Sequence, residues 1–520
     1  MVKGMELWRI AVDTGGTFTD CIGVDPSGEV HQVKVLSSGE LRGRAEEAEG
    51  GAVLVQGLPD MPEAFWVGFR FQRGGTAYRI GGARIERQGV RLILDGGGMP
   101  EIRSGEVVVL STGEEAPVVG IRLLTATGPR EALPPIDLRL GTTRGTNALL
   151  ERKGDPPLLI VTEGFGDLPR IRDQRRPDLF ALKVALPEPL HGRVLELSTR
   201  LDADGEILEP LDRDHLWNLL TNDGDSPPRT AAVCILHSYR NDAVEGAIAE
   251  ILEEAGVAYI ASSAKLAPYI GYLSRMETAL VDAYLGPLME AYLDSVGKRL
   301  PEGGRFRVMT SAGGLLSRRH FRPKDSLLSG PAGGVAGVAA IGVRTQRSHL
   351  LALDMGGTST DVSRYSGKRD LVESHEVGGA RLSAPALRIE TVAAGGGSIC
   401  GFDGKLLTVG PESAGADPGP ASYGRGGPLT LTDVNLLLGR FPEANIGIPM
   451  DRRAAETAFE AVRRQVEEGT GERANREDLL KGFLEIANER MSQAMQRISV
   501  REGYDPKEFS LVAFGGAGGQ

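Results

Sequence analysis

The chain of 520 residues contains only three cysteines, Cys21, Cys234 and Cys400, which lie far apart in the sequence. This number and spacing exclude a disulfide framework and a cysteine-based zinc site, and they indicate a reducing, cytoplasmic environment. No run of about 18 apolar residues occurs, so we expect no membrane-spanning helix. The first six residues, Met-Val-Lys-Gly-Met-Glu, lead into a strand without the apolar core of a signal peptide.

Long basic tracts and metal-binding histidine patterns are also missing. The formal net charge is −11 and no Lys/Arg-rich tract offsets it, which argues against nucleic acid as a partner. The short basic cluster at residues 170–176 suits a small anionic ligand better than a duplex. The seven histidines are scattered without a spacing that predicts a metal site.

The most informative feature present is a repeated motif. Asp13-Thr-Gly-Gly-Thr-Phe-Thr-Asp20 recurs as Asp354-Met-Gly-Gly-Thr-Ser-Thr-Asp361, each copy following an apolar run and preceding a second strand-like stretch. This pattern predicts two β-hairpins of the same design in two halves of one chain.

Each hairpin carries groups that suit a nucleotide. Glycines at a turn let the backbone N–H groups approach a ligand, threonine hydroxyls add donors, and strand-end aspartates can hold Mg²⁺ through its waters. We expect Asp13 and Asp354 to hold Mg²⁺, with Thr17 and Thr358 beside them as catalytic residues. Asp20 and Asp361 either orient water or metal, or bond to nearby backbone. The further nucleotide-binding candidates are Gly15, Gly16, Thr19, Gly356, Gly357 and Thr360.

The rest of the chain predicts an α/β protein of more than one domain. We expect an N-terminal domain at 1–200 with a β-rich insert at 37–135, a middle α/β region at 201–342, and a last domain at 343–520. Within the insert, a stretch such as Ala64–Phe71 is expected to form a strand, and no catalytic residue is expected there. The predicted long helices are Ser274–Leu300, the Gly/Ala-rich helix Ser329–Gly342, and Glu477–Val500.

The order of these segments resembles the actin-like ATPase superfamily. The order is hairpin, Gly/Ala helix, second hairpin, long helix and then Leu511-Val-Ala-Phe-Gly-Gly-Ala-Gly-Gly519. The resemblance implies two actin-like (RNase H-like) domains around a nucleotide cleft, with ATP and Mg²⁺ as cofactors. It also implies that Gly515, Gly516 and Gly518 form the adenosine motif.

Within that superfamily the sequence motifs are similar to those of the hydantoinase A/5-oxoprolinase family. The stretches that carry the resemblance are Leu140–Gly154, Gln174–Pro177, Ser329–Val335, Ala393–Ser398 and Gly410–Gly424. The family implies ATP-dependent opening of a cyclic amide, above all 5-oxo-L-proline to L-glutamate by phosphorylation of the lactam oxygen. It further implies a hydantoinase B-like subunit or fused half as partner, and an oligomer.

Six polar residues are our candidates for the substrate side. An arginine can pair bidentately with a small carboxylate such as that of 5-oxoproline, or it can tie a loop to the domain surface, and both interpretations stay open. Two other glycine-rich stretches, Ala394–Ser398 and Asp417–Pro420, match the family without a role that follows from their residues. The six candidates are Thr142, Thr143, Asn147, Arg172, Gln174 and Arg176.

The sequence departs from the family pattern at two places. The 37–135 block is unlike the family's usual short linker, and the chain ends at Gln520, before the second crossing helix of the superfamily. We therefore expect a fragment of a longer polypeptide or an incomplete second domain. The alternatives to 5-oxoproline hydrolysis are a hydantoinase of the N-methylhydantoin type, the ATP-using subunit of an acetone-type carboxylase, and a nucleotide-switched binding protein.

Overall fold

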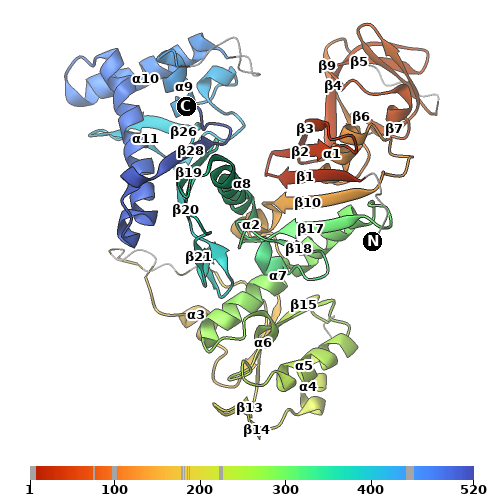
Figure 1. Cartoon of the computed structure of the whole chain (residues 1–520), viewed down its shortest axis with the longest axis vertical. Coiled ribbons are helices and arrows are strands. Elements are labelled where there is room, and N and C mark those ends of the chain that lie inside the picture. Colours follow the sequence, from red (N-terminus) through yellow and green to blue (C-terminus); the bar gives the residue numbers. More distant parts are fainter. Residues whose placement is uncertain are drawn as a thin grey trace. The chain divides into compact units, whose positions relative to one another are not determined.

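The computed structural model describes residues 7–73, 76–96, 102–176, 180, 182–183, 186, 188–221, 227–440 and 450–520. It divides into two compact units (Figure 1). The first unit contains residues 1–330 and 373–386, and the second contains 331–372 and 387–520. Each unit combines sheets with packed helices, which confirms the predicted α/β class. No helix among the described residues is long and apolar enough to cross a membrane.

The first unit is built on a six-stranded sheet in the order β18-β17-β10-β1-β2-β3. Strands β1, β2 and β3 form an antiparallel meander, whereas β10 and β17 run parallel to β1. The strands are β1 Trp8–Thr14, β2 Phe18–Val24, β3 Val30–Leu36, β10 Ile136–Thr142, β17 Arg305–Met309 and β18 Leu315–Ser317.

A closed six-stranded barrel lies between β3 and helix α1 (Ala116–Thr125) in the sequence. Its core holds Phe65, Trp66 and Phe69 together with Val119 of α1. Helix α1 also packs on β2 and β3, so this helix contributes both to the barrel core and to the packing of the six-stranded sheet. The barrel strands are β4 Glu40–Glu49, β5 Ala52–Gln56, β6 Arg70–Arg73, β7 Thr76–Glu86, β8 Gly89–Leu94 and β9 Glu106–Ser111.

The prediction of one strand at Ala64–Phe71 is wrong. Residues Glu63–Trp66 form a 3-10 turn that follows Pro62, and only Arg70–Arg73 is a strand. Gly68 has a φ of +97° between the two, a left-handed conformation that breaks a strand. The aromatic side chains reach the barrel core from this turn, which explains why their apolar run imitated a strand.

A second, parallel sheet of the first unit has the order β12-β11-β15-β16. Because its strands lie on both sides of residue 200, the predicted domain boundary there is wrong. The strands are β11 Leu158–Thr162, β12 Val194–Leu197, β15 Thr230–Cys234 and β16 Tyr259–Ser262; a small pair joins β13 Arg200–Leu201 to β14 Ile207–Glu209. The helices of this region are α2 Arg144–Leu150, α3 Leu168–Ile171, α4 Arg213–Thr221, α5 Ala243–Glu254 and α6 Ser263–Leu266.

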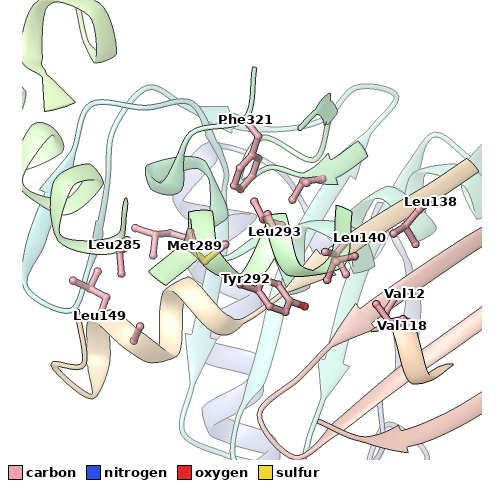
Figure 2. Packing of buried hydrophobic residues seen from close by; sticks show 14 of the residues in the cluster. Val12, Val118, Leu138, Leu140, Leu149, Leu285, Met289, Tyr292, Leu293 and Phe321 are labelled. Atoms are coloured by element: carbon pink, nitrogen blue, oxygen red, sulfur yellow. The ribbon is translucent and has the colours of Figure 1, made fainter. Parts of the chain in front are cut away.

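Helix α7 (Tyr272–Gly297) joins the two sheets of the first unit. Its first half packs on the second sheet through Met276, whereas its second half reaches the six-stranded sheet. Figure 2 shows Met289, Tyr292 and Leu293 of α7 beside Leu140 of β10 in this core. One long apolar helix therefore serves as the shared core element of both sheets.

The second unit has a four-stranded sheet in the order β25-β20-β19-β28. Helix α8 (Ser329–Thr345) packs through Val338 on Leu350 and Ala352 of β19, and α11 (Arg476–Ile498) packs on Leu351 and Leu353. Successive strand residues point to opposite faces, so the two helices cover opposite faces of β19. The strands are β19 His349–Met355, β20 Thr360–Ser366, β25 Ile389–Val392 and β28 Ser510–Phe514.

A helical layer completes the second unit around the hairpin β26–β27. Its core contains Phe459 of α10 and Phe483 of α11. The elements are β26 Ser398–Phe402, β27 Leu407–Ser413, α9 Leu431–Leu437 and α10 Arg452–Thr470.

A short hairpin, β22–β23 (His375–Val377 and Ala380–Leu382), interrupts the sequence of the second unit but packs on α7 of the first. The backbone N–H of Ser383 donates to Thr278 Oγ1 at 2.8 Å, which fixes the hairpin on that helix. The chain therefore passes between the units at residue 330, and again on either side of 373–386. The first of these passages lies inside α8, twelve residues before the predicted boundary at 342.

Four strands of each unit form the same arrangement. The order β3-β2-β1-β10 of the first unit matches β25-β20-β19-β28 of the second. In both, the first three strands are antiparallel and the fourth runs parallel to the strand that carries the aspartate. The repeated sequence motif is thus part of a repeated sheet.

Candidate functional site

The turn after Asp13 is held by backbone and serine hydrogen bonds. Gly15 N–H donates to Phe18 O at 3.0 Å, and Ser37 uses its hydroxyl to donate to Gly15 O at 2.8 Å. Asp13 pairs with Asp20 across the hairpin, and both side chains lie on its exposed side. The Gly-Gly turn and the carboxylates are therefore presented to solvent, as the motif predicts.

Two of the predicted nucleotide ligands, Thr19 and Thr360, have another role. Thr19 is fully buried and its Oγ1 lies 3.0 Å from the Ser37 hydroxyl. Thr360 is also fully buried, and its hydroxyl donates to the carbonyl of Ala394. The alternation of a strand points both side chains away from the aspartates next to them, so they hold the turns from behind.

The loop after β10 lies directly beside Asp13. Gly141 is the cross-strand partner of Asp13, and Thr143 N–H donates to Thr14 O at 2.9 Å. Asn147 Nδ2 donates to Thr143 Oγ1 at 3.3 Å and lies 3.4 Å from the position of a Cβ on Gly16. Thr143 and Asn147 therefore join the hairpin, whereas Thr142 is buried and accepts from Arg144 N–H.

Glycines leave space around the Asp13 carboxylate. A Cβ on Gly141 would lie 3.2 Å from Asp13 Oδ1, and a Cβ on Gly330 would lie 3.9 Å from the same atom. Gly330 follows Ser329, whose hydroxyl donates to Thr142 O at 2.8 Å and fixes the start of α8 here. We call Asp13, Gly15, Gly16, Thr17, Gly141, Thr143, Asn147 and Gly330 the Asp13 cluster.

Asp354 lies in a corresponding cluster of the second unit. Gly515, with a φ of +95°, is so close that a Cβ would lie 2.4 Å from Asp354 Oδ1. Ala517 N–H donates to Met355 O at 2.8 Å, which places the loop after β28 against the second hairpin. Gly334 of α8 would bring a Cβ to 3.6 Å from Asp354 Oδ2. Glycine is required at position 515 by both its conformation and this close approach.

The glycine-rich stretch Ala394–Ser398 completes this second cluster. Gly396 N–H donates to Gly356 O at 3.0 Å, and Gly397 N–H donates to Gly357 O at 2.6 Å. A Cβ on Gly395 would lie 2.7 Å from Ser359 N. The stretch therefore supports the turn from behind. We call Asp354, Gly356, Gly357, Thr358, Gly395, Gly396, Gly397, Gly515, Gly516 and Gly518 the Asp354 cluster.

The charges of the two clusters differ. In the first, Lys34 of β3 is the cross-strand neighbour of Asp20, and its Nζ binds both carboxylate oxygens at 2.8 Å. In the second, Thr391 occupies the equivalent position and donates to Asp361 Oδ1 at 2.6 Å. The repeated aspartates Asp20 and Asp361 thus bond to side chains rather than to nearby backbone, and a role toward water or metal stays a prediction. The sequence motif does not contain Lys34, and only the strand register reveals it.

Desolvation acts on one carboxylate of each repeated hairpin. The surrounding protein raises the pKa of Asp13, and the charge of Asp20 adds to that shift while Lys34 opposes it. The Asp13 side chain stays accessible to solvent, so we attribute the effect to crowding rather than complete burial. Burial likewise raises the pKa of Asp361, against the hydrogen bond from Thr391. A cation near either site would favour the charged carboxylates.

The predicted substrate residues separate into two groups. Arg172, Gln174 and Arg176 make no hydrogen bond or ion pair with the Asp13 cluster among the described residues. Arg172 Nε instead donates to the buried Glu277 at 2.8 Å, the loop-fixing alternative, while Gln174 and Arg176 are exposed. Pro177 lies outside the described residues.

Each cluster contains one aspartate, the exposed Asp13 or the half-buried Asp354, surrounded by glycines that have no side chain. That donor set fits Mg²⁺ held through water, because one or two carboxylates cannot replace its whole octahedral shell. Among the described residues, three potential metal-ligand side chains converge only at Asp25, Glu29 and His31, at the turn between β2 and β3. Hydrogen bonds within this group and from Ser27 to Asp25 account for its geometry.

Comparison with known proteins identifies the chain's relatives. Residues 275–520 match the model of the hydantoinase/oxoprolinase family, and residues 9–58 and 95–256 match its N-terminal region. Within the 37–135 block only residues 59–94 match neither family model. The departure from the family pattern is therefore confined to those residues. The 5-oxoprolinase PfmaA of Pestalotiopsis fici is 37% identical over 456 residues, which cover 78% of this chain and 35% of that protein.

Two solved structures share the fold. An ATP-dependent caprolactamase from Pseudomonas jessenii has a TM-score of 0.71 at 25% identity, covering 98% of this chain and 66% of that one. A nucleotide-free acetone carboxylase has a TM-score of 0.66 at 22% identity, covering 99% of this chain and 66% of that one. The chain spans about a third of the length of the 5-oxoprolinase that it matches.

Proposed function

Because the chain belongs to the hydantoinase/oxoprolinase family, we propose that it is the ATP-using part of a cyclic amidohydrolase. The substrate class is a lactam, most specifically 5-oxo-L-proline, which is opened to L-glutamate. We further propose that the two units are actin-like ATPase domains, each of which presents one phosphate-binding turn. The observation that carries the proposal is the repeated sheet with a solvent-facing Asp-x-Gly-Gly-Thr turn in each copy, where x is Thr14 or Met355.

The reaction explains why ATP is needed. A lactam is a resonance-stabilised amide and a poor electrophile, and transfer of the γ-phosphoryl group to its oxygen makes the ring carbon more reactive. Water then attacks that carbon, the C–N bond breaks, and ADP, phosphate and the amino acid are released. Phosphoryl transfer requires positioning and charge neutralisation more than covalent help.

The residues of the clusters supply that positioning. The N–H groups of Gly16 and Gly357 would donate to phosphate oxygens, as in other anion-binding turns, whereas those of Gly15 and Gly356 close the two turns by donating to Phe18 O and Ser359 O. Thr17 and Thr358 are exposed and would add hydroxyl donors. Mg²⁺, held through water by the aspartate of a cluster, Asp13 or Asp354, would neutralise phosphate charge. Thr143 and Asn147 would orient the group that receives the phosphoryl.

The loop at 515–518 would hold the nucleoside, in keeping with its place beside Asp354. Gly516 has no atom within 4 Å of its Cβ position, so this part of the loop is open to a ligand. The remaining length of the related 5-oxoprolinase suggests a partner, so we propose a hydantoinase B-like subunit or fused half.

Binding of Mg-ATP to the chain tests the nucleotide site directly. We expect Asp354→Asn to weaken binding by about 10- to 100-fold, the cost of losing a charge-assisted contact. The matched control is Asp403→Asn at the exposed turn between β26 and β27, which should bind normally. Equal affinity in Asp354→Asn and the unaltered chain, measured by calorimetric titration, would remove Asp354 from the proposed site.

Turnover with the partner tests the substrate class. ADP and phosphate release should rise when 5-oxo-L-proline is added to the complete complex. Failure of every cyclic amide to stimulate ATP use would exclude this chemistry. Bicarbonate-dependent ATP use would then favour a carboxylase, whose fold the acetone carboxylase likeness already allows.

A further inference from the structure

A pocket of the first unit lies apart from both clusters. It has about 440 Å³ of open space, including solvent at its mouth, and apolar residues such as Leu190 and Leu280 line it. The pocket is also lined by the charged residues Arg152, Arg172 and Glu188. We call the set Arg152, Pro169, Arg172, Glu188, Pro189, Leu190, Glu277, Leu280, Gly378, Gly379 and Ala380 the Arg152 pocket.

The two arginines of the pocket are held in an unusual backbone conformation. Arg152 has a φ of +56° and Arg172 has a φ of +54°, in the left-handed region that residues with a Cβ rarely occupy. Both positions end a helix, Arg152 just after α2 and Arg172 at the end of α3, and Lys153 N–H donates back to Ala148 O at 2.9 Å. The helix endings therefore fix where the two side chains leave the backbone.

A buried carboxylate fixes one arginine and leaves part of it free. Glu277 accepts from Arg172 Nε at 2.8 Å and from the Arg381 backbone N–H at 3.1 Å. No described residue accepts from the two terminal nitrogens of Arg172. The guanidinium is thus oriented by Glu277 while its outer edge stays available for a bidentate contact with a carboxylate.

The remaining charged groups of the pocket have opposite signs. Arg152 and Glu188 are exposed, and neither has an ion-pair partner among the described residues. The charge of Glu277 is offset by Arg172, so the unpaired groups at the rim are one cation and one anion. A ligand that satisfies both must itself carry a carboxylate and an ammonium group, separated by a short apolar body.

The pocket is too far from the Asp13 cluster to hold the reacting ring. Thr143 precedes helix α2 and Arg152 follows its end, so about nine residues at 1.5 Å each place them roughly 13 Å apart. That distance exceeds the size of a small lactam.

We propose that the Arg152 pocket binds the amino acid produced by ring opening, with its carboxylate on Arg152 and Arg172 and its ammonium on Glu188. Hydrolysis of a lactam creates one carboxylate and one amine from a neutral amide, and the rim matches this new pair of charges. The ligand class rests on the proposed function, whereas the binding site rests on the pocket itself.

Two matched pairs of compounds test the proposal by calorimetric titration of the full chain. L-Glutamate is compared with 5-oxo-L-proline, and 6-aminohexanoate with its lactam. Each open form should bind at least about 10-fold more tightly than its ring, because only the open form can engage Glu188. Equal binding of ring and open form would overturn the proposal.

Substitutions at the rim locate the binding. Arg152→Gln and Glu188→Gln should each weaken glutamate binding by about 10-fold and leave Mg-ATP binding unchanged. Arg87→Gln, at an exposed arginine of the barrel, is the control and should change neither. Glutamate binding that neither rim variant alters, or no glutamate binding beside normal ATP binding, contradicts the pocket. Loss of ATP binding alone contradicts only the proposed nucleotide site.

Discussion

Asp282 of α7 carries a buried carboxyl whose pKa the fold raises. It is almost completely buried, and burial raises its pKa to about 6 despite hydrogen bonds from Lys324 N–H and the Tyr259 hydroxyl. These bonds join α7 to β16 and to the 3-10 turn Pro323–Ser326. The carboxyl is thus more easily protonated in the folded chain than in the unfolded one.

The raised pKa of Asp282 predicts a pH-dependent stability. Between about pH 4 and pH 6 the folded state binds more protons than the unfolded state, so stability falls as the pH rises, by about 3 kcal/mol in all. Asp282→Asn removes this titration. Its melting temperature relative to the unaltered chain should therefore increase from pH 4 to pH 7. The same difference for exposed Asp60→Asn should stay small, and a constant difference for Asp282→Asn would contradict the assignment.

At this scale the sequence predicted the two hairpins but not their surroundings. The Gly-Gly turns and the places of Asp13 and Asp354 before them follow from a local motif, because a tight turn and its flanking strands are specified by neighbouring residues. Lys34 could not be found in this way, since only the pairing of β3 with β2 brings it to Asp20. Thr19 was misassigned because the motif does not state which face of the strand each threonine occupies.

At the scale of elements, the main surprise is the support behind the second turn. The stretch Gly395–Gly397 gave no role in sequence because its partner, the turn at 356–359, is distant along the chain. Contact between them depends on how β20 and β25 pair, which no local pattern specifies. By contrast, α7 and α11 were predicted within about two residues at their starts, since long helices have a strong apolar pattern.

Gly395→Ala tests this support. The added methyl group would meet the backbone of Ser359 and Gly356, which cannot move aside, so we expect a loss of about 1–3 kcal/mol and weaker Mg-ATP binding. Gly246→Ala in α5 is the matched control. Nothing lies within 4 Å of its Cβ position, so it should be neutral or stabilise by up to about 1 kcal/mol. Equal unfolding midpoints in urea for the two variants would contradict the packing described for Gly395.

At the scale of the whole molecule, the chain is two units with separate cores. The sequence predicted more than one domain from length alone, but it placed the boundaries where the pattern of elements changes. The real divisions fall inside α8 and around the hairpin β22–β23, which returns to the first unit. Such an excursion depends on contacts with α7 and leaves no mark in composition.

This division predicts unfolding in more than one step, because multi-domain chains rarely behave as two-state systems. Differential scanning calorimetry should show two transitions. Mg-ATP at about 100 times its dissociation constant should stabilise the nucleotide-binding part by about 2.7 kcal/mol. In Asp354→Asn at the same ATP concentration, that shift should be much smaller. A single transition whose calorimetric and van't Hoff enthalpies agree would contradict the division into units.

The parallel pairing of β19 with β28 also sets an order of events during synthesis. Leu350 pairs with Ser510, so the sheet that carries Asp354 stays open until the last strand has left the ribosome. The corresponding sheet of the first unit pairs Trp8 with Ile136, and the Ser329 hydroxyl donates to Thr142 O at the end of β10. These residues are all synthesised before β28. Between the synthesis of Ser329 and that of Phe514, a nascent chain would thus hold one completed hairpin and one whose sheet still lacks the neighbouring strand β28.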